Sequence, residues 1–504
     1  MINITPALKP KFARLCRAEQ AWRVRAGQQA AQEAVLGYLV RTARDTEVGA
    51  EHGFRTIRCY ADFARKVPLS EYADIRPSVE RMLRGARDVL WPGACSRFAQ
   101  SSGTADGKSK YIPVTVESLH LNHFHGGKAV VAHYLDLYPD SRIFSGKSFI
   151  LGGSFANELR GLPRGVRVGD LSANLIDAIP VAAEMLRVPS REVALMADWR
   201  RKLPALVQAS LGEDITNISG VPSWFLTVLR EVIRAAGAST IHDVWPHLEV
   251  FFHGGISFGP YREQYRAITD PARMRYLETY NASEGFFAVA DVEGSAAMKL
   301  LLDAGVFYEF VPVDDPSAEP VPAWRVEPGA VYAMYITAAN GLWRYATGDT
   351  VRVESVEPLR ITVAGRTKSY INAFGEEVMV HNTDAALAAA CRRTGAAALN
   401  YTAAPVYAAD GRRGRHQWLI EWQTPPADPE AFADLLDAEL QAVNSDYQAK
   451  RAGGIFLDRL ELTTAREGLF DDWLAATGKL GGQRKVPRLA NDRHIIDALL
   501  TLNK

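Results

Sequence analysis

The sequence is poor in cysteine, has no excess of charge of either sign and contains no long apolar run. Its 504 residues include four scattered cysteines without a CxxC pair: Cys16, Cys59, Cys95 and Cys391. This usage excludes a disulfide framework and a cysteine-rich zinc site, and it indicates reduced thiols in a cytoplasmic protein. The 58 basic residues balance the 58 acidic ones, which argues against a general nucleic-acid binder. No stretch reaches about 18 uncharged apolar residues, so we expect no membrane anchor.

The length and the strand pattern predict two domains. A chain of 504 residues exceeds what one hydrophobic core usually holds. Apolar runs at Ser148–Leu151 and Val250–Phe252 are each followed closely by a glycine pair, which is typical of parallel strands whose carboxyl ends collect ligands. The composition shifts after Gly365–Lys368. We therefore predict a large α/β domain over residues 1–365, with sheets flanked by helices, and a small α+β domain over residues 366–504.

Periodicity places several elements within these domains. In the first, we expect helices over residues 5–48 and strands at 332–337 and 350–353. In the second, we expect a helix at 384–392, a strand at 417–422, a helix that opens at Asp428-Pro429, and a strand at 455–462. We also expect a helix at 119–130 and a strand and turn at 149–155.

The most informative segment is the loop Ser101–Pro113, which is rich in hydroxyls, glycines and lysines. Its glycines allow backbone N–H groups to turn toward one anion, while hydroxyls and lysines add donors and charge. The candidate phosphate ligands are Ser101, Ser102, Gly103, Thr104, Lys108 and Lys110. Three residues separate Gly103 from Gly107, whereas a Walker A loop needs four, so a P-loop kinase or ATPase is disfavoured. Alone, such a loop is a surface turn about as often as a ligand site.

Two further motifs carry carboxylates. In Tyr280–Gly285, Glu284 is suited to Mg²⁺, which takes few protein carboxylates and completes its shell with phosphate oxygens and water. The alternative is a helix N-terminus capped by Ser283. Asp349 follows Gly348 and can accept both hydroxyls of a ribose, although an aspartate in a hairpin turn is the commoner explanation.

Two basic motifs follow. Arg366 offers a guanidinium to a phosphate or a ribose, with a solvated turn between domains as the alternative. Residues 481–488 form a basic loop that begins with two glycines and includes Lys485, and the alternative here is a surface tail.

Three closely spaced histidines suggest a metal, but helix geometry argues against it. On a helix that holds His120 and His123 on one face, His125 lies about 140° round from His120, so the three side chains cannot converge. A polar helix or pocket lining is the preferred interpretation.

Taken in order, these motifs resemble one family closely: the acyl acid amido synthetases of the Gretchen Hagen family, within the adenylate-forming (ANL) superfamily. The segments that carry the resemblance are Val67–Tyr72, Leu90–Gly93, Phe98–Pro113, Tyr280–Gly285, Gly341–Val353, Gly365–Glu376 and Lys485–Arg488. The resemblance runs from about Thr46 to Leu489. The sequence departs from the family at Ala105-Asp106, where Thr and a small residue are usual, and it is shorter than the plant members.

The resemblance implies an activity and a set of roles. A carboxylate attacks the α-phosphorus of ATP with Mg²⁺, which gives acyl-AMP and pyrophosphate, and an amine, usually an amino acid, then displaces AMP. The implied roles are phosphate binding by Ser101, Ser102, Gly103, Thr104 and Lys108; nucleotide binding by Tyr280, Asn281, Ser283, Asp349 and Arg366; Mg²⁺ binding by Glu284; and catalysis by Ser102, Thr104 and Lys485. Tyr280 is expected near adenine and Asp349 at the ribose hydroxyls. Lys485 is expected to be brought in by a mobile C-terminal domain. The resemblance also implies that the acyl pocket draws on the helix at 119–130 and the strand and turn at 149–155.

The acceptor is the main alternative. An acyl-CoA ligase shares the first step and differs in its nucleophile. A basic docking strip for coenzyme A is not evident, and Glu376 and Glu377 suit an ammonium-bearing acceptor. We therefore expect a small carboxylic acid and an amine as partners, with no nucleic acid and no membrane. The oligomeric state is left open.

Overall fold

A computed structural model describes most of the chain. The described residues are 3–101, 110–157, 159–255, 258–366, 370–371, 376, 378–406, 414–444, 447–448, 451, 457–477, 485–490 and 492–504. They fall into two compact units. The first unit holds the described residues up to 255 and those from 266 to 363. The second holds residues 258–265 together with the described part of the chain from Ala364 onward.

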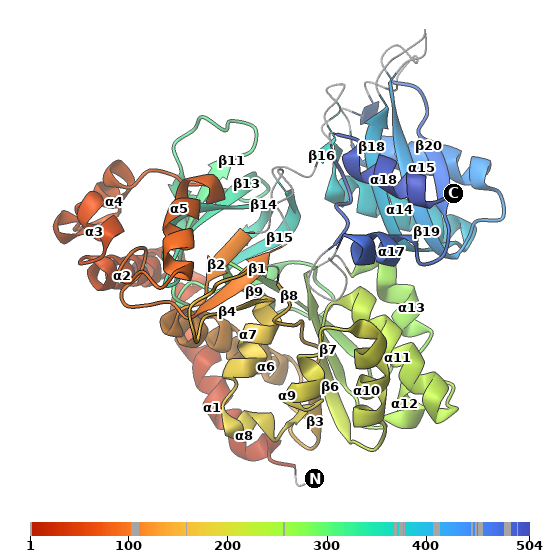
Figure 1. The fold of residues 1–504 in the computed structure, drawn as a ribbon, viewed down its shortest axis with the longest axis horizontal. Coiled ribbons are helices and arrows are strands. Elements are labelled where there is room, and N and C mark those ends of the chain that lie inside the picture. Colours follow the sequence, from red (N-terminus) through yellow and green to blue (C-terminus); the bar gives the residue numbers. More distant parts are fainter. Residues whose placement is uncertain are drawn as a thin grey trace. The chain divides into compact units, whose positions relative to one another are not determined.

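The first unit combines helices with one large sheet and one small one (Figure 1). Its α-helices are α1 Thr5–Ala18, α2 Arg25–Ala43, α3 Glu47–Glu51, α4 Tyr60–Lys66, α5 Tyr72–Leu83, α6 Phe124–Leu137, α7 Leu171–Ala178, α8 Val181–Glu184, α9 Arg191–Ala194, α10 Trp199–Leu211, α11 Pro222–Ala236 and α12 Ile241–Val244. Short 3₁₀ or π turns are η1 Glu19–Arg23, η2 Phe54–Thr56, η3 Ser118–His123 and η5 Ala323–Arg325.

Among the described residues, twelve strands form the large sheet in the order β12-β11-β13-β14-β15-β10-β9-β8-β7-β6-β3-β5. They are β3 Lys147–Ile150, β5 Arg187–Val188, β6 Ile215–Gly220, β7 Val250–Gly254, β8 Arg275–Ala282, β9 Gly285–Ala290, β10 Met298–Leu300, β11 Val306–Pro312, β12 Val321–Pro322, β13 Val331–Ala338, β14 Leu342–Val356 and β15 Leu359–Arg366. A smaller sheet has the order β2-β1-β4, with β1 Arg97–Ser101, β2 Lys110–Pro113 and β4 Arg167–Gly169.

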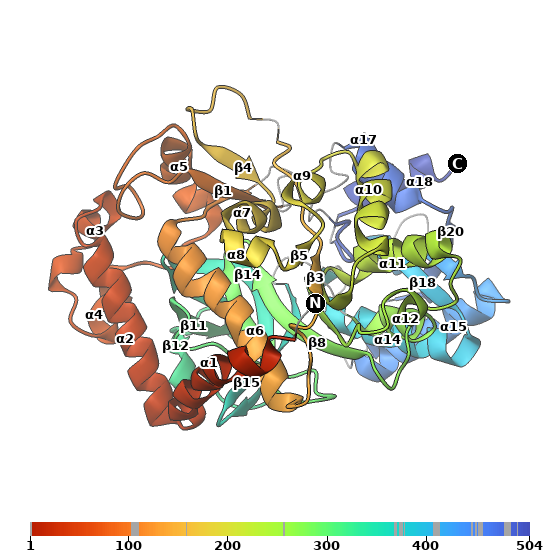
Figure 2. The ribbon, with the colours of Figure 1, turned by 90° about the horizontal axis from the view of Figure 1, so that it is seen from below.

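The predicted parallel sheet is confirmed in one half of the large sheet. Strands β5, β3, β6, β7 and β8 run parallel to one another, whereas β8 pairs with β9 in the antiparallel sense. All five residues of β7 are buried, as expected for a strand covered by helices on both faces. Figure 2 shows α1 and α6 side by side against this unit's sheet. The predicted strands near 332–337 and 350–353 are confirmed as β13 and part of β14.

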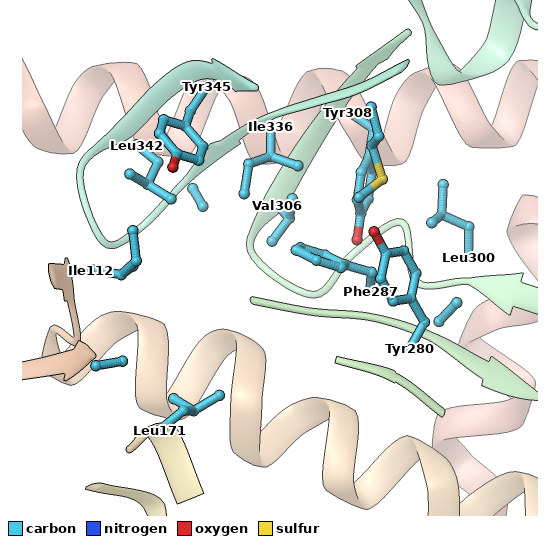
Figure 3. Packing of buried hydrophobic residues seen from close by; sticks show 14 of the residues in the cluster. Ile112, Leu171, Tyr280, Phe287, Leu300, Val306, Tyr308, Ile336, Leu342 and Tyr345 are labelled. Carbon is cyan, nitrogen blue, oxygen red and sulfur yellow. The ribbon is translucent and has the colours of Figure 1, made fainter. Parts of the chain in front are cut away.

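The core of this unit lies where α5, β1 and β2 meet strands β8–β11, β13 and β14. Phe287, Tyr308, Ile336, Leu342 and Tyr345 are fully buried in it. Figure 3 shows the Tyr280 ring beside Phe287 and the Tyr345 ring near Leu342. The strands that carry the candidate nucleotide ligands are therefore set in a packed apolar layer, which holds them rigidly.

The second unit is a small α+β domain. Its main sheet has the order β18-β19-β20. The elements are η4 Gly259–Tyr261, α13 Arg262–Arg266, β16 Tyr370–Ile371, β17 Val378–Met379, α14 Val380–Thr394, β18 Ala397–Val406, β19 Arg415–Thr424, α15 Pro429–Val443, β20 Glu461–Ala465, α17 Leu469–Ala476 and α18 His494–Leu502. The predicted helix at Asp428-Pro429 is confirmed, because Asp428 accepts hydrogen bonds from the N–H groups of Glu430 and Ala431.

Two sequence-based expectations were wrong in part. Within the described part of the strand expected at 455–462, β20 begins only at Glu461. Before it, Leu457 makes a single bridge with Gly414, and Leu457 and Leu460 are apolar because they pack in the core. The helix expected at 119–130 begins as the π-helix η3 and becomes α-helical at Phe124. No helix in the described part of the chain is long and apolar enough to cross a membrane.

Candidate functional site

The predicted phosphate loop connects two paired strands. Ser101 ends β1 and lies opposite Lys110, the first residue of β2. Ser102, Gly103, Thr104 and Lys108 fall outside the described residues, as does the side chain of Ser101. The described end of the loop is held by Lys110, whose Nζ donates to the Tyr345 hydroxyl at 3.3 Å. The ammonium also lies 5.7 Å from the centre of the Tyr345 ring, so the start of β2 lies close to β14 of the large sheet.

Two of the predicted nucleotide ligands contact each other directly. The Tyr280 hydroxyl on β8 donates to Oδ2 of Asp349 on β14 at 2.7 Å. Both side chains are only 7% exposed, so this is a short, charge-assisted hydrogen bond in a low-dielectric setting. The Tyr280 ring packs edge-on against Phe287, with centroids 5.0 Å apart. Tyr280 therefore orients the Asp349 carboxylate, and its predicted place near adenine stays a prediction.

Asp349 lies in a bulge inside β14. Ala333 pairs with Thr350 and Tyr335 pairs with Ala346, so three residues of β14 lie opposite one residue of β13. Gly348 takes a φ of 80° there, a conformation that glycine adopts without strain. The Thr347 hydroxyl donates to the Met334 carbonyl at 3.0 Å. Bulges often change the direction of a side chain next to an active site. Because Asp349 lies inside a strand, the alternative of an aspartate in a hairpin turn is wrong.

The Tyr280–Gly285 motif is a β-hairpin and not a helix N-terminus, so that alternative is also wrong. Ala282 pairs with Gly285 across the turn between β8 and β9. Ser283 and Glu284, at the tip, are nevertheless buried. The Asn340 side chain donates to the Glu284 carbonyl at 3.0 Å, which ties this turn to the turn between β13 and β14. Asn281 lies beside it on β8 and is half-buried.

A buried ion pair supports β14 behind the bulge. Arg344 makes two hydrogen bonds to the Glu309 carboxylate, at 2.8 and 2.9 Å, and it also donates to the carbonyls of Ala64 and Val67. Its φ of 44° is unusual for a residue with a side chain and costs about 1–2 kcal/mol, which these contacts offset. Arg344 is 4% exposed and Glu309 1%. This arginine holds the strand that carries Asp349.

The turn expected to line the acyl pocket is tightly fixed. Lys202 on α10 is buried and donates from Nζ to the Gly152 carbonyl at 2.6 Å. Burial lowers the pKa of Lys202 to about 8. Asp170 accepts a hydrogen bond from the Ser154 N–H at 2.7 Å. A Cβ at Gly153 would lie 2.1 Å from Oδ2 of Asp170, so only glycine fits there.

The three histidines do not converge. His120 packs edge-on against Phe124, with centroids 5.7 Å apart. His123 is buried, and desolvation lowers its pKa to about 4. His125 lies 3.3 Å from an oxygen of Asp303, a hydrogen bond that raises its pKa. In the described part of the chain no group of three histidine, cysteine or acidic side chains is arranged to hold a metal.

The predicted residues of the second region are described only in part. Arg366 ends β15, and its side chain lies outside the described residues. Lys485 is exposed. Glu376 is fully buried, and one of its oxygens lies 2.9 Å from Nε2 of His416. The expectation that Glu376 faces an ammonium-bearing acceptor was therefore wrong, because its carboxylate belongs to the core of this unit. Glu377 lies outside the described residues.

Sequence reasoning missed several supporting residues. Asn340 precedes Gly341, and an Asn-Gly pair is a hairpin signal that was available in the sequence. Lys202 and Glu309 carry no such signal. Lys202 is one of three consecutive basic residues in α10, Glu309 is a single acid in β11, and each acts on a residue far away in the chain.

Comparison with known proteins gives one consistent family. Models of the GH3 family match over residues 20–274 for its N-terminal domain, 299–366 for its central domain and 381–494 for its C-terminal domain. The indole-3-acetic acid-amido synthetase GH3.8 of Oryza sativa subsp. indica is 23% identical over 556 residues, which cover 93% of this chain and 89% of that protein. The indole-3-acetic acid-amido synthetase GH3.3 of Arabidopsis thaliana is 22% identical, with 93% and 90% covered.

Solved structures share the fold. The GH3.15 acyl acid amido synthetase has a TM-score of 0.79 at 17% identity, with 98% of this chain and 96% of that chain covered. An open conformation of 2-hydroxyisobutyryl-CoA ligase has a TM-score of 0.53 at 14% identity, with 88% and 89% covered. The predicted α/β fold, with a large N-terminal and a small C-terminal domain, is confirmed by these similarities.

Proposed function

Because the chain belongs to the GH3 family, we propose that it is an ATP-dependent acyl acid amido synthetase. It activates a small carboxylic acid as acyl-AMP and transfers the acyl group to an amine, which we take to be an amino acid. The relatives are indole-3-acetic acid-amido synthetases and an acyl acid amido synthetase by name. The scattered free thiols are consistent with action in the cytoplasm.

One observation carries the proposal. Three motifs that lie far apart in the sequence meet in the first unit: Lys110 contacts Tyr345, Tyr280 contacts Asp349, and Asn340 contacts the backbone of Glu284. Side-chain contacts between strands that are not paired with each other thereby join the end of a phosphate-directed loop, a carboxylate suited to ribose hydroxyls and the turn that carries a carboxylate suited to a cation. This is the set of groups that adenylation of a carboxylate needs.

The residues suit a nucleotide with its cation. Glu284 is buried at a turn whose backbone is fixed by Asn340. A single carboxylate fits Mg²⁺ held mainly by substrate phosphates and water, and does not fit an all-protein cage. When bound there, Mg²⁺ supplies charge neutralisation for the phosphates.

The protein contributes position and charge. Asp349, oriented by Tyr280, accepts the two ribose hydroxyls, and the loop after Ser101 donates to the phosphates. The carboxylate of the acid then attacks the α-phosphorus in line, the bond to pyrophosphate breaks, and Lys485 neutralises charge between the two anions. In the second step the amine attacks the acyl carbon, loses a proton and expels AMP. The family membership favours an amine over coenzyme A as the acceptor. No residue of an acceptor site is used in this choice.

Exchange of labelled pyrophosphate into ATP tests the first step. With a panel of carboxylic acids and Mg²⁺, we expect exchange that depends on the acid, and release of AMP on turnover. Asp349→Ala is the matched inactive control, and Asp315→Ala, on an exposed loop, is the active one. Release of ADP and phosphate would refute adenylation and favour a kinase.

A further inference from the structure

The segment that follows Lys485 is fixed to the edge of the small sheet. The Ala403 N–H donates to the Arg488 carbonyl at 2.8 Å, and the Ala490 N–H donates to the Ala403 carbonyl at 3.2 Å. Leu489 forms a parallel bridge with Ala403. The Thr402 hydroxyl donates to the Pro487 carbonyl at 2.7 Å. Residues 487–490 therefore extend the sheet beside β18, and the alternative of a loose surface tail is wrong for them.

The Arg488 side chain locks this segment to a helix. Its guanidinium pairs with Oδ1 of Asp384 on α14 and lies 5.2 Å from the centre of the Tyr401 ring. The Tyr401 hydroxyl donates to the same Asp384 oxygen at 2.6 Å and lies 2.7 Å from the Thr383 hydroxyl. The side chains of Arg488 and Asp384 are 18% and 12% exposed. One half-buried arginine thus joins β18, α14 and the segment that begins at Lys485.

Lys485 lies three residues before this anchor and is exposed. Three extended residues span about 10 Å, and the lysine side chain adds four rotatable bonds, so the position of its ammonium depends on where the backbone near residue 488 is fixed. A group that acts on a reacting phosphate must be held to about 0.5 Å, and a misplacement of about 1 Å can cost 100-fold in rate. The backbone that carries Lys485 therefore needs a fixed point close by.

We propose that Arg488, held by Asp384 and Tyr401, is a positioning residue for Lys485 in the adenylation step. The inference rests on the proposed function, because it takes Lys485 to act between the carboxylate and the α-phosphate. Without the Arg488–Asp384 pair, the segment that begins at Lys485 loses its side-chain anchor to α14, and the lysine samples positions from which it does not reach the reacting atoms. The amine-transfer step does not use Lys485 and is unaffected.

The same unit offers a matched control. Arg451 binds Asp437 through Nε at 3.0 Å and a terminal nitrogen at 2.8 Å, and the Tyr447 hydroxyl donates to Asp437 at 2.6 Å. This is a second arginine–aspartate–tyrosine cluster of similar burial, but it is far from Lys485 in the chain. Arg451→Ala therefore reproduces the loss of a buried ion pair without loosening the segment after Lys485.

The test compares the two half-reactions in the full-length protein. Formation of acyl-AMP is measured by pyrophosphate exchange with the best acid, and transfer is measured with supplied acyl-AMP and an amine, each per folded molecule. We expect Arg488→Ala to lose about 100-fold in kcat for exchange, with the KM for ATP unchanged and transfer within about threefold of wild type. Arg488→Lys, which keeps the charge, should recover part of the exchange rate. Arg451→Ala should lower Tm while leaving both half-reactions intact.

Several results would overturn the inference. Normal exchange by a folded Arg488→Ala protein, or equal loss in both half-reactions, contradicts a positioning role while the proposed function stands. Normal exchange by Lys485→Ala also contradicts the positioning role of Arg488, because adenylation would then not need Lys485. If Arg488→Ala does not fold, Asp384→Asn keeps the size of the side chain and must show the same selective loss. Absence of exchange by the wild-type protein with every acid would reject the proposed function itself.

Discussion

Removing one hydroxyl tests whether the contact between Tyr280 and Asp349 serves the nucleotide. Tyr280→Phe keeps the ring that packs against Phe287 and deletes the 2.7 Å hydrogen bond to Asp349. A hydrogen bond to a charged group is worth about 1.5–3 kcal/mol, which corresponds to roughly 10- to 150-fold in an equilibrium constant. Because Asp349 is proposed to bind the ribose, the loss should raise the KM for ATP by a factor in this range.

The core supplies a matched control. Tyr308 belongs to the same apolar cluster, and its hydroxyl has no hydrogen-bond partner within the described residues. Tyr308→Phe should therefore leave the KM for ATP unchanged and should not lower Tm. Steady-state pyrophosphate exchange with ATP varied at saturating acid, and then with acid varied at saturating ATP, separates a nucleotide effect from a general loss.

The expected result is a higher KM for ATP, an unchanged KM for the acid and a small change in Tm for Tyr280→Phe. A variant that melts early but uses ATP as well as wild type would show that the hydrogen bond only holds two strands together. The assignment of Asp349 to the ribose would then lose its structural support.

Three further predictions concern stability and substrate use. Arg344→Ala leaves the buried Glu309 carboxylate without its counter-ion and, among the described residues, with only the Tyr60 hydroxyl as a side-chain donor, so urea unfolding should show a loss of about 3–5 kcal/mol; a loss below 1 kcal/mol would refute the role of this pair. Burial disfavours the charged form of His133, yet its hydrogen bonds to Cys16 and Glu19 raise its pKa to about 9. The stabilisation by protonated His133 should therefore be complete below about pH 6.5 and be lost as the pH rises through 9. Urea titrations at several pH values should show this decrease in the unfolding free energy for the wild type and not for His133→Gln. Gly153→Ala introduces a clash with Asp170 and should raise the KM for the acid more than that for ATP; an equal rise would argue against an acyl-side role for this turn.

The parallel strands could be predicted from the sequence because local patterns encode them. The apolar runs that became β3 and β7 are followed closely by glycines, and strands buried on both faces must be apolar throughout. The same reasoning failed for β14, which is one strand of 15 residues. Gly348 interrupts its pattern and suggested a turn, whereas the structure absorbs the glycine as a bulge.

The candidate site was predicted as a set of residues but not as an arrangement. Asp349 and Tyr280 each stood out by residue type, yet their contact joins positions 69 residues apart and depends on strand order and on the bulge that turns Asp349. For Glu376, the predicted location itself was wrong. Its charge suggested an exposed acceptor site, but His416 pairs with it in the core, and a buried partner so far along the chain leaves no trace in the local sequence.

The acceptor gives the most direct test of the central claim. The wild-type protein is supplied with its best acid, ATP, Mg²⁺ and either a mixture of amino acids or coenzyme A, and the products are identified by mass spectrometry. We predict an amide of the acid with an amino acid, formed together with AMP. A thioester with coenzyme A and no amide would contradict the account and identify an acyl-CoA ligase.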